Sequence, residues 1–213
     1  MNSKAHWEHI YETKKPDQVS WFEPEATLSL ALVRRVAPTR AEAIIDVGAG
    51  AATFVDGLLS AGYQHITVLD LSAAALLQAQ RRLGERAQAV EWREADVLSA
   101  AFPNCAFDVW HDRAVFHFLT RAADRRAYVA QVRRALRPGG FALVATFAAD
   151  GPSRCSGLEV ARYSADSLHA EFGDDFRLLS SDRQTHVTPW GAEQPFTYCL
   201  CRYEPHASTR HAA

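Results

Sequence analysis

The sequence predicts an α/β fold of the Rossmann-like type, with a mostly parallel sheet and helices on both faces. One observation is the β-branched apolar run at residues 44–47, which leads through Gly48-Ala49-Gly50 into apolar residues at helical spacing. A second is that later apolar runs end at or just before an acid, as at Asp70 and Asp96. The third is that strand-like and helix-like runs alternate, which implies parallel strands joined by right-handed crossovers.

Composition indicates one domain, residues 1–213, without a nucleic-acid or membrane surface. The chain has 213 residues, 48% of them hydrophobic, enough to bury a full core. Its 23 basic and 25 acidic residues form no basic run. Four cysteines without Cys-x-x-Cys spacing and a polar N-terminus without a signal-peptide core favour the cytoplasm. The apolar run 141–149 is too short to cross a bilayer, and the scattered histidines predict no metal site.

The first 22 residues are unusually aromatic for a polar segment, with rings at Trp7, Tyr11, Trp21 and Phe22. Two interpretations are open: a permanently packed staple, or a lid that closes over a flat ligand. We expect residues 1–22 to form such a lid. An amphipathic helix then follows Pro24, and residues 206–213 are expected to form a frayed tail.

The glycine turn and the strand after it point to a nucleotide-like ligand. Glycines after residues 44–47 allow a sharp turn and close approach of a ligand to a helix N-terminus, although an ordinary βα turn would look similar. A second strand, 65–70, ends at Asp70 about 20 residues further on, where a carboxylate can accept from both ribose hydroxyls. Ser72 is expected to cap the next helix. A third strand, 89–94, leads to Asp96-Val97.

The fourth strand, 107–111, is followed by a cluster of polar and aromatic residues at 112–118. Open α/β sheets place their chemistry at this end of a strand. The next helix is expected to end at Arg137-Pro138-Gly139-Gly140, before a fifth strand from Phe141. Beyond a short helix capped by Ser164, two strands at 176–180 and 196–200 predict an antiparallel hairpin at the sheet edge.

These motifs together resemble the class I S-adenosylmethionine-dependent methyltransferases. The resemblance implies a seven-stranded sheet whose last strand is antiparallel, and S-adenosyl-L-methionine as cofactor. It assigns the cofactor to the glycine motif, the ribose acid and the adenine contact, which are Asp46, Gly48, Gly50, Asp70 with Leu71, Asp96 and Val97. Ala52 departs from that family's third glycine. Thr53 stands where a dinucleotide fold would need glycine, which disfavours a nicotinamide-dependent oxidoreductase.

Two shorter stretches resemble the thiopurine and tellurite-resistance methyltransferases. They are the aromatic segment from Trp7-Glu8 to Ser20-Trp21-Phe22, and Trp110 to Ala114. The resemblance implies that Tyr11 and Trp21 fold over the cofactor, that Asp112 and Arg113 lie between cofactor and acceptor, and that the acceptor is small and soft. A protein lysine methyltransferase, with a protein substrate, is the alternative.

Candidate acceptor-site residues follow the fourth and fifth strands. Proton handlers, if one is needed, are His111, Asp112, His117 and His186, each of which could equally be structural. Phe116 beside His117 is expected to wall the acceptor site, and Arg113 to steer an anionic acceptor unless it pairs with a carboxylate. Cys155, in a loop after the fifth strand, is expected to rim the site, although a lone cysteine is more often structural.

Overall fold

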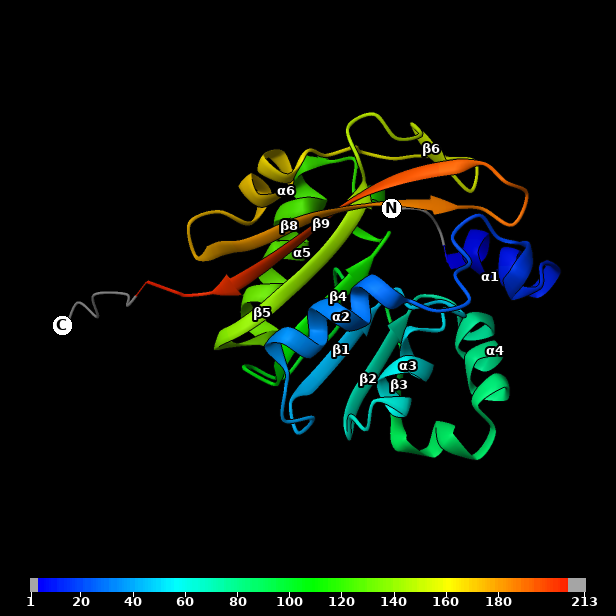
Figure 1. Ribbon diagram of the computed structural model, residues 1–213, viewed down its shortest axis with the longest axis horizontal. Coiled ribbons are helices and arrows are strands. Elements are labelled where there is room, and N and C mark those ends of the chain that lie inside the picture. Colours follow the sequence, from blue (N-terminus) through cyan, green and yellow to red (C-terminus); the bar gives the residue numbers. More distant parts are fainter. Residues whose placement is uncertain (1–3, 207–213) are drawn as a thin grey trace.

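The computed structural model describes residues 4–206, built on a seven-stranded sheet in the order β3-β2-β1-β4-β5-β9-β8 (Figure 1). The strands are β1 Ala43–Val47, β2 His65–Asp70, β3 Val90–Glu94, β4 Phe107–Arg113, β5 Leu136–Phe147, β8 Phe176–Val187 and β9 Glu193–Tyr203. Strands β1 to β5 run parallel, whereas β9 is antiparallel to both β5 and β8. The predicted sheet, including its antiparallel last strand, is confirmed. Residues 1–3 of the predicted lid and 207–213 of the predicted tail lie outside the described residues.

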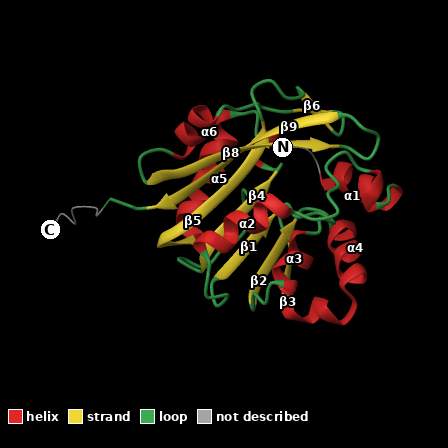
Figure 2. Cartoon of the chain, viewed as in Figure 1, coloured by secondary structure: helices red, strands yellow, loops and turns green. Residues whose placement is uncertain are grey.

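Helices cover both faces of the sheet, as predicted (Figure 2). Two groups can be distinguished by the core they pack into: α2 Thr27–Val36, α3 Phe54–Ser60 and α4 Ala73–Leu83 on one face, and α5 Ala122–Ala135 and α6 Ala165–Phe172 on the other. Helix α1, Lys4–Thr13, lies beside α4. Short 3-10 turns occupy Pro16–Gln18, Gly84–Ala89 and Phe116–Phe118, and β6 Arg154–Cys155 pairs with β7 Leu158–Glu159.

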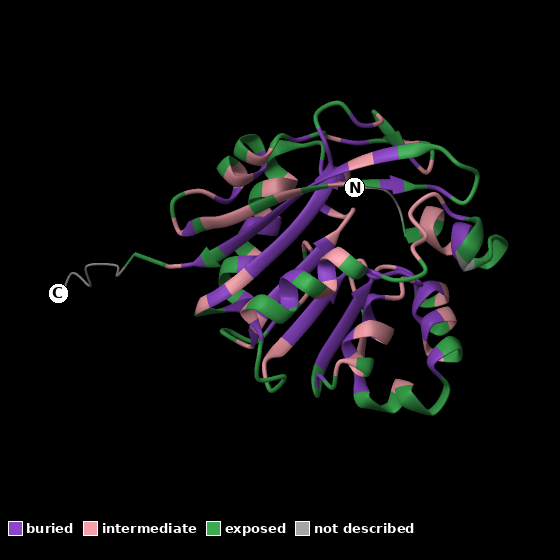
Figure 3. Cartoon of the chain, in the orientation of Figure 1, coloured by how far each residue is buried: buried purple, intermediate pink, exposed green. Residues whose placement is uncertain are grey.

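The central strands are buried on both faces, which explains their continuous apolar sequence (Figure 3). Ile44 and its neighbour Ile45 are both fully buried but belong to opposite core clusters, because successive side chains of a strand point to opposite faces. Ser72 and Ser164 cap α4 and α6 as predicted, each accepting a hydrogen bond from a backbone N–H three residues later. Local sequence therefore fixes where these helices begin.

Strands β4, β5, β8 and β9 are longer than the sequence predicts, and β5 and β8 differ in ways that bear on the site. Strand β5 begins at Leu136, directly after α5, instead of at Phe141. The 137–140 segment continues the strand as an irregularity, since the register with β4 shifts between Phe107 and Val109 and Gly139 has a φ of 85°. Strand β8 extends to Val187 because it pairs with β9 along its whole length, although its side chains are largely polar. His186 therefore lies on a strand.

The parallel strands deliver their carboxyl ends to one edge of the sheet. The glycine turn after β1, the acid at the end of β2 and the turns after β3 and β4 meet there. Within residues 4–206, no helix is both long enough and apolar enough to span a membrane.

Candidate cofactor and acceptor site

The turn after β1 requires glycine at two positions. Gly48 and Gly50 have φ values of 62° and 54°, in the left-handed region that favours glycine. A Cβ on Gly48 would stand 1.9 Å from Cγ2 of Val115, and one on Gly50 would stand 2.1 Å from the hydroxyl of Tyr11. The turn is therefore enclosed by the segment after β4 on one side and by helix α1 on the other.

Asp70, at the end of β2, is tied to this turn. Its carboxylate accepts hydrogen bonds from the backbone N–H of Gly50 at 2.7 Å and from that of Ser72 at 2.8 Å. Burial raises the pKa of Asp70 to about 6, although these hydrogen bonds oppose the rise. Each oxygen keeps a free lone pair, so the carboxylate can still accept from a ligand hydroxyl.

A cavity with an empty volume of about 810 Å³, part of it open to solvent, lies at this edge of the sheet. It is lined by the turns after the first four strands and by the aromatic N-terminal segment. The lining is Trp7, Tyr11, Trp21, Val47, Gly48, Leu69, Asp70, Leu71, Ala95, Asp96, Val97, Arg113, Ala114, Val115, Phe118, Leu119 and Cys155. Its lining, mainly apolar and aromatic with a few polar groups, is typical of a small-molecule site.

Most of the residues predicted to bind the cofactor line this one cavity. They are Tyr11, Trp21, Gly48, Asp70, Leu71, Asp96 and Val97. Asp96 accepts a hydrogen bond from the backbone N–H of Leu98 at 2.9 Å through one oxygen. Gly50 does not line the cavity, but its backbone N–H donates to the Asp70 carboxylate and so helps to orient it.

The structure places Asp46 outside the main cavity. It lines a smaller one nearby, and its carboxylate lies 2.7 Å from Nδ1 of His111. The other ring nitrogen of His111 lies 2.9 Å from the hydroxyl of Ser29 on α2. All three side chains are buried, so this polar chain joins β1, β4 and α2 beneath the glycine turn.

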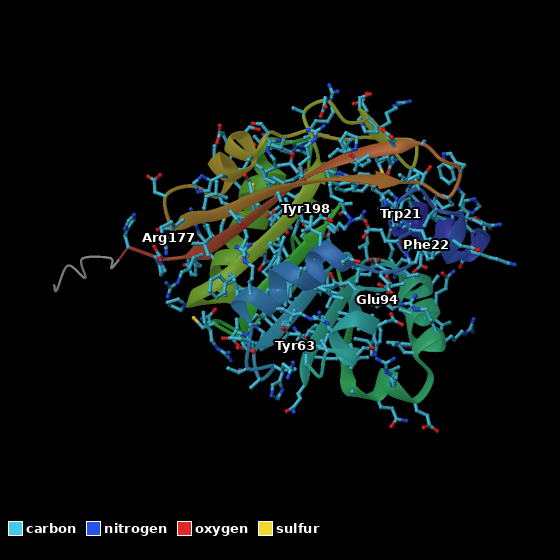
Figure 4. The ribbon with its side chains drawn as sticks, in the orientation of Figure 1. Trp21, Phe22, Tyr63, Glu94, Arg177 and Tyr198 are labelled. Atoms are coloured by element: carbon cyan, nitrogen blue, oxygen red, sulfur yellow. The ribbon has the colours of Figure 1, made fainter. Side chains whose placement is uncertain are left out.

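Arg113 lines the cavity, but its guanidinium is already engaged. It donates to the Glu23 carboxylate at 2.9 Å, to the Tyr198 hydroxyl at 3.1 Å and to the Trp21 carbonyl at 3.2 Å. It also lies 4.4 Å from the ring centre of Phe196. Figure 4 labels Trp21 beside α1 and Tyr198 on β9, the two parts of the molecule that Arg113 connects. The arrangement matches the carboxylate-paired alternative for this side chain.

Asp112 is fully buried and supports the turn that follows β4. It accepts from the backbone N–H groups of Val115 at 2.8 Å and Phe116 at 3.1 Å, and from the Tyr128 hydroxyl at 2.5 Å. Burial raises its pKa to about 6, against these hydrogen bonds. Asp112 does not reach the cavity.

The 116–118 turn points its side chains differently from the sequence prediction. Phe116 is fully buried in the core, with its ring centre 5.0 Å from that of Tyr128. His117 is also fully buried, and its Nδ1 accepts from the backbone N–H of Phe147 at 3.4 Å. Burial, with a smaller effect of Arg113, lowers the pKa of His117 to about 3, so the ring is neutral. Phe118, which the prediction did not select, reaches the cavity instead.

Of the remaining two predicted acceptor residues, His186 and Cys155, only Cys155 lines the cavity. The Nε2 of His186 donates to the Ser20 carbonyl at 2.6 Å, and its Nδ1 lies 3.5 Å from the Glu23 carboxylate. His186 therefore supports the N-terminal segment and does not line the cavity. Cys155 does line it, and burial raises the pKa of its thiol to about 11. This thiol stays protonated at neutral pH.

Several cavity residues were missed by the sequence prediction. Trp7 meets Phe118 at 5.1 Å and Trp21 at 5.8 Å between ring centres, so the three rings form one wall. The aromatic bias of residues 1–22 signalled this wall, but it did not show which rings face inward. Ala114, with a φ of 75°, turns the chain into the cavity, and an alanine gives no such signal in sequence.

Comparison with known proteins finds similarity in the central segment of the chain. Residues 44–140 match the family model of the methyltransferase domain. An uncharacterized methyltransferase of Mycobacterium tuberculosis is 31% identical over 132 residues, which cover 60% of this chain and 61% of the relative. The chain thus spans less than two thirds of that relative.

Two solved structures share the fold. One comes from work on the conversion of a disulfide bond into a thioacetal group during echinomycin biosynthesis, with a TM-score of 0.76, 20% identity, and coverage of 97% of this chain and 95% of that one. The other is the N-methyltransferase NodS of Bradyrhizobium japonicum in complex with S-adenosyl-L-homocysteine, with a TM-score of 0.71, 16% identity, and coverage of 96% and 100%.

Proposed function

We infer that this chain, whose residues 44–140 match a methyltransferase domain, is a class I methyltransferase dependent on S-adenosylmethionine and transfers a methyl group to a small, soft acceptor such as a thiol, a selenol or a metalloid compound. The observation that carries this proposal is the chemistry of the cavity lining other than Asp70 and Asp96. The rest of the lining consists of aromatic and aliphatic side chains and one protonated thiol, and its one charged side chain, Arg113, is already paired.

The cavity fits the cofactor. Asp70 would accept from the ribose hydroxyls through its free lone pairs, and Asp96 with Val97 would hold the adenine. A Cβ on Gly48 would collide with Val115, so glycine there keeps the cavity wall in place. The bound cofactor supplies a methyl group on a sulfonium centre, which is activated for in-line displacement. The protein's task is then to position the acceptor and to exclude water.

Among the described residues, the side chains predicted to handle a proton are not free to act as a general base. His117 faces the core with a lowered pKa, Asp112 is saturated with donors, and His186 is held by Ser20 and Glu23. An amine or hydroxyl acceptor must lose a proton before or during transfer, whereas a thiol with a pKa of about 8.5 supplies some thiolate by itself. The wall therefore favours an acceptor that arrives as a nucleophile.

For Arg113 the proposal follows the second of the two predicted alternatives, a structural pair with a carboxylate. Its ion pair with Glu23 is largely buried, with 11% and 12% of the two side chains exposed. An anionic acceptor would have to compete with this carboxylate for the same guanidinium. We assign Arg113 to holding Trp21 and Glu23 against β9, so that the aromatic wall keeps its shape.

A screen with isotopically labelled S-adenosylmethionine tests the proposal. Thiols, selenols, arsenite, halides and phenols are offered separately, and methylated products are measured. We expect thiols or their heavier analogues to react, with a rate that rises with pH in step with the thiolate fraction of each acceptor. Labelling of a protein substrate with none of the small acceptors would contradict the proposal and support a protein lysine methyltransferase.

A further inference from the structure

Helix α4 lacks an acid of its own at its N-terminus. Ser72 caps the helix by accepting from the backbone N–H of Ala75, but the first turn consists of alanines and contains no acidic residue. Helix N-termini carry unpaired N–H groups and a partial positive charge, which a carboxylate in the first turn would normally satisfy. The helix therefore leaves N–H groups for a partner from elsewhere in the chain.

Glu8, on α1, provides that carboxylate from 65 residues away. It accepts from the backbone N–H groups of Ala73 at 2.8 Å and Ala74 at 3.0 Å, and from the hydroxyl of Ser72 at 2.9 Å. Burial would raise the pKa of Glu8, but the hydrogen bonds from α4 outweigh it and hold the pKa below its ordinary value. The ionised carboxylate is thus the form that this site favours.

Glu8 is connected to the ribose end of the cofactor cavity. Ser72, which donates its hydroxyl to Glu8, also donates its backbone N–H to Asp70. Asp70 in turn accepts from Gly50 in the glycine turn. A chain of hydrogen bonds therefore runs from α1 to the carboxylate that faces the cavity, without Glu8 lining the cavity itself.

Glu8 also fixes the part of α1 that faces the cavity. Tyr11 lies one turn further along the same helix, lines the cavity and stands against Gly50. The side-chain amide of Gln78 on α4 donates to the Tyr11 carbonyl, and Lys4 pairs with Glu94 at the end of β3. Of these links between α1 and the rest of the domain, only that of Glu8 leads to Asp70, through Ser72. Because Glu8 and Tyr11 lie on the same helix, this link connects the position of Tyr11 to that of Asp70.

We propose that Glu8 is a positioning residue of the cofactor pocket, which holds Tyr11 over the glycine turn and Ser72 against Asp70 by closing the N-terminus of α4. The inference rests on the proposed function, because it assumes that S-adenosylmethionine occupies this cavity. Glu8 touches neither cofactor nor acceptor in this arrangement. Its removal lowers the affinity for the cofactor and leaves the transfer step unchanged once the cofactor is bound.

The test compares Glu8→Ala and Glu8→Gln with Glu12→Ala. Glu12 is an exposed acid one turn further along the same helix, and no hydrogen bond of its carboxylate is found among residues 4–206. Calorimetry with S-adenosylhomocysteine is expected to show affinity about tenfold weaker for Glu8→Ala, since two or three charge-assisted hydrogen bonds are lost. Glu8→Gln, which keeps one acceptor oxygen, falls between, and Glu12→Ala binds like the unchanged protein.

Two further measurements distinguish positioning from general stability. With a reactive acceptor, the KM for the cofactor rises in Glu8→Ala while kcat at saturation stays within about twofold. Without cofactor, trypsin cleaves after Lys14 faster in Glu8→Ala than in Glu12→Ala, because α1 has lost its anchor on α4.

The outcomes separate the two proposals. Equal affinity of folded Glu8→Ala, Glu8→Gln and Glu12→Ala for S-adenosylhomocysteine would overturn the role of Glu8. If Glu8→Ala does not fold, Glu8→Gln alone decides, and affinity equal to that of the unchanged protein overturns the proposal. If the unchanged protein fails to bind S-adenosylhomocysteine, the proposed function fails, and cleavage after Lys14 still decides whether Glu8 anchors α1.

Discussion

At the scale of single residues, Asp70 couples ligand binding to proton binding. Its carboxyl is buried, with a pKa raised to about 6 from an ordinary value of 3.8. Because the folded pKa exceeds the unfolded one, Asp70 favours the native state at low pH, and this contribution is lost as pH rises through about 6. A ligand that donates hydrogen bonds to the carboxylate offsets that loss, because it stabilises the ionised form.

We therefore expect the affinity for S-adenosylhomocysteine to rise with pH between about 5 and 7. Protonation of Asp70 at pH 5 removes the acceptor for the ribose hydroxyls in about nine molecules of ten, so affinity should be about tenfold weaker than at pH 7. Calorimetry at several pH values measures this. Asp112 also has a pKa of about 6 but does not line the cavity, so Asp70→Asn should abolish the pH dependence. A slope that persists in Asp70→Asn would assign it to another group.

Most residues predicted for the cofactor converge on one cavity, whereas several predicted for the acceptor do not, and the reason is geometric. Gly48, Asp70 and Asp96 follow the ends of neighbouring parallel strands, so the topology alone brings them together. Phe116 and His117 lie in a 3-10 turn, where the side that faces the cavity depends on how the turn packs. The spacing of residues in the sequence does not show which side of this turn faces the cavity. In the structure it is Phe118 that lines the cavity wall.

At the scale of elements, the glycine turn and the N-terminal segment form one unit. The turn supplies the floor of the cavity, Val115 closes it from β4, and Tyr11 closes it from α1. A Cβ on Gly48 would stand too close to Val115, and one on Gly50 too close to the Tyr11 hydroxyl. The turn thus depends on elements that are distant in the sequence.

Gly48→Ala should damage both stability and binding. The substitution places alanine at a φ of 62°, at a cost of about 1–3 kcal/mol, and drives its Cβ into Val115. We expect a lower free energy of unfolding in urea and affinity for S-adenosylhomocysteine at least about tenfold weaker. Gly191→Ala is the matched control, because Gly191 has a φ of 85° but no heavy atom within 4 Å of an added Cβ. Equal effects of the two variants on binding would show that strain alone matters.

The strands whose bounds differ from the sequence prediction are those whose length depends on hydrogen bonding to a neighbouring strand. The Arg137-Pro138-Gly139-Gly140 motif correctly predicts the end of α5, yet the same residues continue into β5, because β4 offers a partner for Leu136. Strand β8 is too polar to be recognised beyond Ser180, but pairing with β9 satisfies its backbone as far as Val187. In both cases the strand extends because of a partner strand elsewhere in the chain, which the residues of the strand itself do not reveal.

At the scale of the whole molecule, the N-terminal segment joins the two ends of the sheet. Glu8 and Lys4 attach it to α4 and β3, while Arg113 and His186 attach the following residues to β4 and β8. The cofactor cavity lies between these attachments. A ligand in that cavity would therefore contact both the N-terminal segment and the turns after the first four strands.

Binding there should stabilise the entire native state. S-adenosylhomocysteine at one hundred times its Kd lowers the free energy of the folded protein by about 2.7 kcal/mol if the unfolded chain does not bind it. For a chain of this size, that corresponds to a rise in Tm of about 5–10 °C. NAD should produce no rise, because the turn carries Thr53 where a dinucleotide site would need its third glycine. Differential scanning fluorimetry of the unchanged protein and of Asp70→Ala measures both effects, and the variant should show a smaller shift at the same ligand concentration. Protection by NAD and not by S-adenosylhomocysteine would contradict the assignment of the cavity, because the stabilisation depends only on which ligand the native state binds.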